Sequence, residues 1–220
     1  MYIGHRRGHN FKTVGAEGII KEVDSCQIIH NLVDKFLSDM GEHHINLNPP
    51  SLYGKNDVVL TVDTANGEGV ELYFSIHENK YDGVANGCEV WVYDKSFPIA
   101  DSVLNNLVKL GFKNRGIKSS IKEDKPLYEL KHTKMQAMII EVCFCDSHKD
   151  VDLINKVGYE SIAKAIVEGV TGRTYKLTTN DKKGVYQVVT ESFAIKDNAI
   201  EYQNKLKEKG VNSFIDYKEL

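Results

Sequence analysis

Apolar residues recur at helical spacing in three stretches of the chain, each closed or broken by a glycine. The stretches are 19–40, which ends before Gly41, 99–110, which ends before Gly111, and 151–170, which Gly158 is expected to interrupt. An amphipathic helix buries its apolar stripe against other elements. We therefore expect three helices packed against a shared core.

Shorter runs rich in β-branched and aromatic residues lie between these helices and predict strands. They are 71–76 (ELYFSI), 89–93 (EVWVY), a short run around Tyr128, and 137–145 (AMIIEVCFC). The run 58–62 (VVLTV) has strand propensity, but Asn56 and Asp57 can cap a helix, and we favour a helix. Alternating helices and apolar strands predict an α/β fold, with a mostly parallel sheet covered by helices on both faces.

The pattern changes after Gly172. Residues 174–184 include the polar, unperiodic run KLTTNDKKG and predict a linker, so the first domain is expected to span 1–173. Residues 185–220 then show the order strand, helix, strand, which predicts a small C-terminal βαβ domain. A unit of this size buries little apolar surface alone. It would pack on the first domain, pair with a second copy, or be marginally stable.

Composition excludes several classes of protein. The chain has 220 residues, 41% of them hydrophobic, and a net charge of −3, so we expect a folded core and no nucleic-acid partner. No run of apolar residues is long enough to insert in a membrane, and the first residues, MYIGHRRGHNFK, do not resemble a secretory signal. The 4 cysteines are too few for a disulfide scaffold, which indicates synthesis in a reducing cytoplasm.

Three ligand-type residues are expected near one edge of the sheet. His9 and His77 each follow a predicted strand, and Glu22 lies in the opening turns of the first helix. Sites in open α/β sheets lie outside the carboxyl ends of the strands. Two imidazoles and one carboxylate match a catalytic zinc site with an open fourth position, although their sequence spacing alone does not define a metal site.

Glu141 is the most unusual residue of the predicted strands. A carboxylate inside the apolar run AMIIEVCFC is unfavourable unless it is paired, lies beside a metal, or is protonated. Strand alternation places Cys143 and Cys145 on the same face as Glu141. We interpret the two cysteines as small buried residues near the site rather than as a soft-metal or redox pair.

Other polar residues have simpler interpretations. His43 and His44 enter a short strand after the first helix, and we interpret them as surface histidines. Arg6 and Arg7 either line a substrate groove or form a solvated surface pair.

Five ordered blocks carry a resemblance to a known family. They are GHNFKTVGAEGIIKE (8–22), SIHEN (75–79), NRGIK (114–118), PLYEL (126–130) and IEVCFCDSHKDVDLI (140–154). Over residues 1–172 the chain resembles zinc-dependent N-acetylmuramoyl-L-alanine amidases, above all clostridial phage endolysins. The resemblance implies that His9, Glu22 and His77 are zinc ligands and that Glu141 is the catalytic glutamate. Asn10-Phe11-Lys12 and Glu78 depart from the family pattern without removing a ligand.

The resemblance also implies a function. The substrate would be bacterial peptidoglycan, cleaved between N-acetylmuramic acid and the L-alanine of the stem peptide by zinc-activated water, with Glu141 as general acid and base. The enzyme would be made in the host cytoplasm and would reach the cell wall after membrane permeabilisation. The tail is similar to half of a SPOR-type domain, which implies cell-wall binding or a homodimer. The alternatives are a zinc peptidase of stem peptides and a non-catalytic cell-wall-binding protein.

Overall fold

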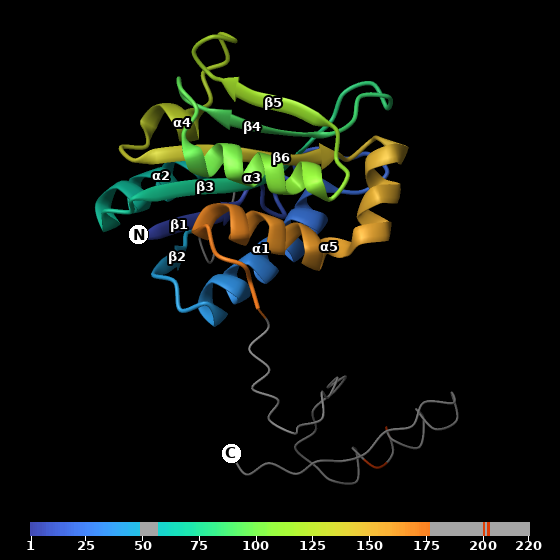
Figure 1. Cartoon of the computed structure of the whole chain (residues 1–220), viewed down its shortest axis with the longest axis horizontal. Helices are drawn as coiled ribbons and strands as arrows, with labels where there is room; N and C mark the ends of the chain where they lie inside the picture. Colours follow the sequence, from blue (N-terminus) through green and yellow to red (C-terminus); the bar gives the residue numbers. More distant parts are fainter. Residues whose placement is uncertain (49–56, 177–199, 201, 203–220) are drawn as a thin grey trace. The chain divides into compact units, whose positions relative to one another are not determined.

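Six strands form one mixed sheet in the computed structural model, which describes residues 1–48, 57–176, 200 and 202 (Figure 1). The strand order is β2-β1-β3-β6-β4-β5. The strands are β1 (Ile3–Arg7), β2 (His44–Asn46), β3 (Leu72–Asn79), β4 (Cys88–Val92), β5 (Asn114–Ser119) and β6 (Gln136–Phe144). All neighbouring pairs are parallel except β4 with β6. The predicted mostly parallel sheet is therefore confirmed.

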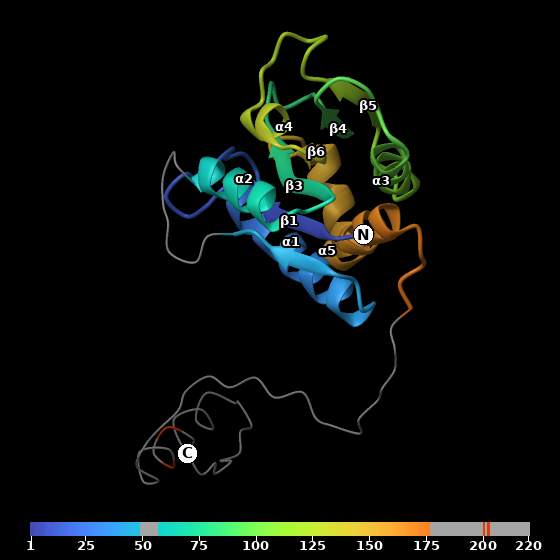
Figure 2. The same ribbon diagram turned by 90° about the vertical axis from the view of Figure 1, so that its left-hand side faces the viewer.

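Helices cover both faces of this sheet, as predicted. They are α1 (Glu22–Asp39), α2 (Asp57–Glu68), α3 (Pro98–Lys109), α4 (Tyr128–His132) and α5 (His148–Thr171). Helices α1, α3 and α5 lie on one face, and α2 and α4 lie on the other (Figure 2). Among the described residues, no helix has the length and apolar character that crossing a membrane requires.

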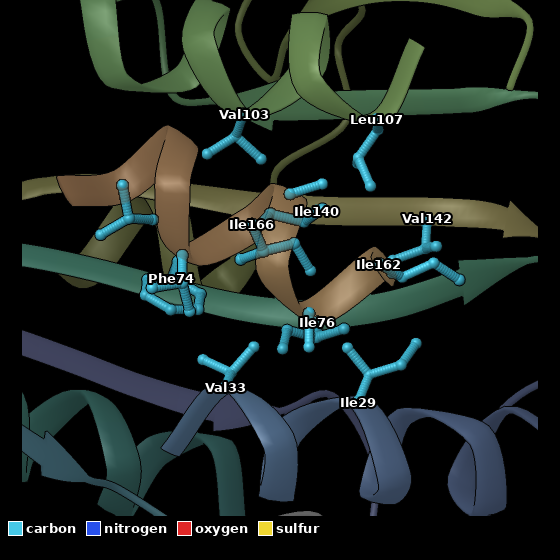
Figure 3. Packing of buried hydrophobic residues seen from close by; sticks show 14 of the residues in the cluster. Ile29, Val33, Phe74, Ile76, Val103, Leu107, Ile140, Val142, Ile162 and Ile166 are labelled. Carbon is cyan, nitrogen blue, oxygen red and sulfur yellow. The ribbon is translucent and has the colours of Figure 1, made fainter. Parts of the chain in front are cut away.

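Strand alternation divides the buried side chains between two cores. On β3, Phe74 and Ile76 point into the larger core, whereas Tyr73 belongs to the smaller core beneath α2 and α4. Figure 3 shows Ile29 and Val33 of α1 directed at these two β3 residues. Burial of each such side chain contributes about 1.5–3 kcal/mol to folding. This packing fixes α1 against the sheet and thereby fixes the position of Glu22 at its first turn.

The helices that the apolar periodicity predicts are confirmed. The three amphipathic stretches form α1, α3 and α5, and the ambiguous run 58–62 lies within α2, as we favoured. Gly158 divides α5, because its backbone is non-helical, with φ 78° and ψ 153°. The strands expected at 71–76, 89–93 and 137–145 correspond to β3, β4 and β6.

Two elements differ from expectation. Tyr128 begins the short helix α4 rather than a strand, because Leu130 packs into the smaller core one helical turn after Pro126-Leu127. Strand β5 was not anticipated, since Arg115, Gly116 and Lys118 give it no apolar alternation. The predicted linker and βαβ domain over 174–220 lie outside the described residues, apart from residues 174–176, 200 and 202.

The short strand expected after the first helix is β2, but its one histidine, His44, differs from the prediction. The His44 side chain is only 13% exposed, and its Nδ1 lies 2.9 Å from Nε2 of His5 on β1. The interpretation of His44 as a surface histidine is therefore wrong. The burial of His44 was not predictable from the sequence, because the partners of its side chain come from β1 and from α1.

Candidate metal centre

His9, Glu22 and His77 lie together at the carboxyl ends of β1 and β3. Glu22 is the first residue of α1, and its Oε1 lies 3.0 Å from His77 Nδ1 and 3.4 Å from His9 Nε2. The two imidazole rings are nearly perpendicular, at 83°, with centroids 5.1 Å apart. The fold thus brings one nitrogen of each histidine and one carboxylate oxygen to a common point.

Backbone groups hold each of these side chains in place. Glu22 accepts hydrogen bonds from the N–H of Ala16, at 2.6 Å, and from the N–H of Glu78, at 3.1 Å. Nδ1 of His9 lies 3.1 Å from the carbonyl oxygen of Thr13 and donates to it. That bond leaves the lone pair of His9 Nε2 free to act as a ligand, which is how metal-binding histidines are oriented in proteins.

Two glycines make room for the site. A Cβ at Gly8 would come within 2.2–2.4 Å of three atoms of the His77 ring. A Cβ at Gly15 would lie 2.3 Å from Glu22 Oε2, and φ there is +73°, a conformation that favours glycine. The glycines around His9 are therefore required by the close approach of the three candidate ligands.

Burial and mutual contact shift the pKa values of the three side chains. Burial lowers the pKa of His9, and the neighbouring His77 lowers it further. Burial opposes ionisation of Glu22, but the hydrogen bond with His77, the charges of His77 and His9 and the Ala16 N–H together outweigh burial and hold the pKa of Glu22 below its usual value. Burial likewise opposes the charged form of His77, yet contact with Glu22 and the Glu141 charge raise the pKa of His77.

Glu141 lies on β6 as the register partner of His77 on β3. Its side chain is partly buried, and burial raises its pKa to about 7. Across the antiparallel pair, Glu141 faces Glu89 of β4. Glu141, the carboxylate that is unusual in an apolar strand, therefore lies next to the three candidate ligands but is not one of them.

The residues that surround Glu89 were not predicted from the sequence. Arg115 Nε donates to Glu89 Oε2 at 2.8 Å, and Trp91 Nε1 donates to Glu89 Oε1 at 2.9 Å. Asn79 Nδ2 lies 3.3 Å from the same Oε1. Arg115 lies in the block NRGIK, but the sequence alone does not show that this block pairs with β4, the strand that carries Glu89. These bonds hold a second carboxylate, already paired, next to Glu141.

Arg6 is buried, so its interpretation as part of a solvated pair is wrong. It donates to Glu129 Oε1 at 3.1 Å and to the carbonyl oxygen of Gly8 at 2.9 Å, and it lies 3.6 Å from Asp57. Two acidic partners compensate the buried guanidinium. The bond to Gly8 ties this network to the turn that carries His9.

The thiols near the site are buried and free, as expected for small packing residues. Cys143 and Cys145 form no disulfide. Burial raises the pKa of both, so they are protonated near neutral pH. Glu78, the residue after His77, is 2% exposed, and burial raises its pKa to about 8. A protonated Glu78 adds no charge to the site.

The three candidate ligands fit a zinc ion. Ligand atoms about 2.0–2.1 Å from a tetrahedral zinc lie roughly 3.3 Å from one another, and the two contacts of Glu22 Oε1, at 3.0 and 3.4 Å, bracket this value. Within the described residues, His77 Nε2 and Glu141 Oε2 are buried atoms without a hydrogen-bond partner. They are two of nine such atoms in the part of the chain that the structure describes, and both belong to residues of the candidate metal centre.

A family model and a curated relative of this chain point to the same family. A family model described as N-acetylmuramoyl-L-alanine amidase matches residues 3–172. An uncharacterised protein of Clostridium perfringens (strain 13 / Type A) is 37% identical over 178 residues, which cover 77% of this chain and 51% of that protein. The sporulation-specific N-acetylmuramoyl-L-alanine amidase of Bacillus subtilis (strain 168) is 25% identical over 159 residues, 70% of this chain and 59% of that protein.

A solved structure resembles this fold over nearly the whole length of the solved chain. The catalytic domain of the CD27L endolysin, described as targeting Clostridia Difficile, superposes with a TM-score of 0.71 and 29% sequence identity. The match covers 80% of this chain and 99% of that domain. By contrast, the chain spans about half the length of the curated clostridial relatives that it matches.

Proposed function

Because this chain belongs to the N-acetylmuramoyl-L-alanine amidase family, we propose that it is a zinc-dependent peptidoglycan hydrolase. The bond cleaved is the amide between the lactyl group of N-acetylmuramic acid and the L-alanine of the stem peptide. The observation that carries the proposal is the convergence of His9, Glu22 and His77 on one point next to Glu141.

In this proposal His9, Glu22 and His77 hold the zinc. Three protein ligands leave a position open, and the chemistry that zinc supplies there is activation of water near neutral pH and polarisation of a carbonyl. Glu22 gives the ligand set one negative charge. The hydrogen bonds that Ala16 and Glu78 donate to Glu22 fix its direction before metal binds.

Glu141 carries the proton. Its carboxylate accepts a proton from the attacking water and returns it to the amide nitrogen as the carbon–nitrogen bond breaks. The products are the lactyl carboxylate and a free L-alanine amino terminus. Register pairing with His77 keeps the Glu141 carboxylate beside the reacting groups.

The biological setting of the proposal is an endolysin, made in the host cytoplasm and acting on the wall after the membrane is permeabilised. Its support is the similarity to the CD27L endolysin catalytic domain. For residues 185–220 we keep the hypothesis of a SPOR-like unit that binds the cell wall or pairs two chains. That unit lies outside the described residues, apart from residues 200 and 202.

The test is digestion of purified clostridial peptidoglycan with and without a chelator. New amino termini are identified by residue, reducing sugars are assayed in parallel, and Glu141→Gln is the inactive control. We expect L-alanine amino ends that disappear with the chelator and in the variant. Amino ends of other residues would make the protein a stem-peptide peptidase. No release from zinc-loaded protein would make it a cell-wall-binding protein.

A further inference from the structure

A second group of ligand-type side chains lies away from the candidate metal centre. His5 Nε2 is 2.9 Å from His44 Nδ1 and 3.4 Å from Asp34 Oδ1, and His44 Nδ1 is 3.7 Å from the same oxygen. These three atoms lie within 4.8 Å of one another. We call His5, Asp34 and His44 the edge cluster, because β2 is the outermost strand on its side of the sheet.

Strand β1 and helix α1 contribute to both groups, while the third side chain comes from β3 in the first group and from β2 in the edge cluster. Strand β1 carries His5 and leads into His9, while α1 carries Asp34 as well as Glu22. Glu22 and Asp34 are separated along the helix axis by about 18 Å at 1.5 Å per residue. The edge cluster is therefore a separate place in the fold, and its composition repeats that of the first group: two imidazoles and one carboxylate.

Neighbouring side chains orient the two imidazoles of the edge cluster. The other nitrogen of His5, Nδ1, lies 3.0 Å from His30 Nε2, and the other nitrogen of His44, Nε2, lies 3.0 Å from Ser38 Oγ. If His5 Nδ1 donates to His30 and His44 Nε2 donates to Ser38, both facing nitrogens present lone pairs to Asp34. Metal-binding histidines are held by such hydrogen bonds through the distal nitrogen.

Two nitrogen lone pairs that face each other at this distance repel unless a proton or a cation lies between them. Two imidazole nitrogens 2.9 Å apart share a proton when no cation is bound. The distances of 2.9, 3.4 and 3.7 Å within the edge cluster scatter around the spacing of roughly 3.3 Å expected for tetrahedral zinc ligands. A cation can therefore replace the shared proton with small side-chain adjustments.

The exposure of the edge cluster is graded from the core to solvent. The side chain of His5 is fully buried, that of His44 is 13% exposed, and that of Asp34 is 37% exposed. A cation can reach the site past Asp34, and its remaining positions can be filled by water. The Asp34 carboxylate also supplies the negative charge that a divalent cation requires.

We propose that His5, Asp34 and His44 bind a second divalent cation of the zinc class, with a structural role. Imidazole and carboxylate ligands suit zinc better than the hard cations calcium and magnesium. The bound ion would join β1, the three-residue strand β2 and the middle of α1. A strand that short has few ladder hydrogen bonds, so a metal link to two longer elements stabilises it.

The first measurement is zinc stoichiometry on the full, untagged chain, since a polyhistidine tag would itself bind zinc. The protein is stripped with chelator and titrated with zinc against a chromophoric competitor. We expect two equivalents for the wild type and one for Asp34→Asn. Asp63→Asn, an exposed aspartate on α2, is the matched control and should keep both.

The second measurement separates this site from the proposed function. In a His77→Ala background the first site is lost, so any rise in the thermal unfolding midpoint on adding zinc comes from the edge cluster. We expect a rise in His77→Ala and none in His77→Ala/Asp34→Asn. Circular dichroism without zinc shows whether both variants are folded, and wild-type hydrolysis should persist in Asp34→Asn.

The two proposals fail in different ways. One equivalent of zinc in the wild type, retained in Asp34→Asn and lost in His77→Ala, would overturn the edge site and leave the hydrolase intact. Equal zinc-induced stabilisation of the single and double variants would also overturn it. Two equivalents, with loss of one in Asp34→Asn but no amide hydrolysis, would support the edge site and remove the hydrolase.

Discussion

His77 and Glu141 are register partners on the parallel strands β3 and β6. They belong to motifs far apart in sequence, yet the ladder between these two strands fixes their separation. A candidate metal ligand and the proposed proton carrier are thus placed by backbone hydrogen bonds rather than by flexible loops. Substitutions at either position should therefore affect chemistry more than folding.

Replacing Glu141 by glutamine should remove the proton carrier while keeping the shape of the side chain. We expect amide hydrolysis to fall by about 10²–10⁴-fold, the usual contribution of a general acid–base group. Zinc content should stay at the wild-type value, because Glu141 is outside the ligand group. The measurements are release of L-alanine amino ends and metal analysis. Loss of zinc together with activity would show that Glu141 acts as a ligand.

Replacing His77 by alanine should remove one equivalent of bound zinc and abolish hydrolysis. The remaining His9 and Glu22 leave a two-ligand site, which is too weak to retain a catalytic ion. His132→Ala, at an exposed position on α4, is the matched control and should keep zinc and activity. Full zinc content in His77→Ala would contradict the assignment of His77.

Replacing Gly8 by alanine tests the close approach of backbone and ligand. The new Cβ would meet the His77 ring at 2.2–2.4 Å, so the imidazole must move. A displacement of about 1 Å can reduce catalysis by roughly 10²-fold, and we expect a loss of this size in peptidoglycan hydrolysis, with weaker zinc binding.

Gly67→Ala is the control for that substitution. Gly67 lies in α2 with open space around it, so alanine there should leave hydrolysis unchanged and stabilise the protein by about 0.5–1 kcal/mol. Hydrolysis by Gly8→Ala at the wild-type rate would show that the His77 ring adapts without consequence.

Two buried histidines, His5 in the edge cluster and His30 beside it, predict a loss of stability in acid. Burial lowers the pKa of His30 to about 4 and that of His5 well below its usual value. Between roughly pH 6.5 and pH 4 the unfolded chain, with its ordinary histidine pKa, therefore binds more protons than the folded chain. The contribution of each neutral histidine is complete above pH 6.5 and is lost as the pH falls.

This prediction is checked by urea unfolding of chelator-treated protein at pH 7 and pH 5. His30 should account for up to about 2 kcal/mol of the difference in the free energy of unfolding between these values. His30→Gln removes that titration, so its stability should fall less over the same interval. An equal fall in the variant and the wild type would mean that burial does not lower the pKa of His30 in the folded protein.

The sequence predicted the parts of the fold that periodicity dictates. The apolar positions of α1 and the largely apolar run of β6 define their elements locally, because burial of those residues is the main driving force. Strand β5 is different: Arg115 and Lys118 occupy an edge strand whose position depends on pairing with β4. Helix α4 is only five residues long, and it depends on tertiary packing of Leu130 and on the ion pair of Glu129 with Arg6.

In the candidate site, too, some residues were predictable from the sequence and others were not. His9, Glu22 and His77 were identified from their places in recognisable blocks, and the fold brings them together. The partners of Glu89 and of His44 were not found, since Arg115, Asp34 and His5 reach them from other elements. Pairing between side chains far apart in the chain depends on strand order, which one sequence does not display.

Helix α1 limits where residues can be inserted into this chain. Glu22 at its first residue, Asp34 further along and the core residues between them are all placed by one continuous helical repeat. A single inserted residue would turn everything beyond it by about 100° and advance it by about 1.5 Å. Such an insertion would separate Glu22 from Asp34 in phase and turn Ile29 or Val33 out of the core. Natural variants of this protein should therefore keep the number of residues between Glu22 and Asp34 constant.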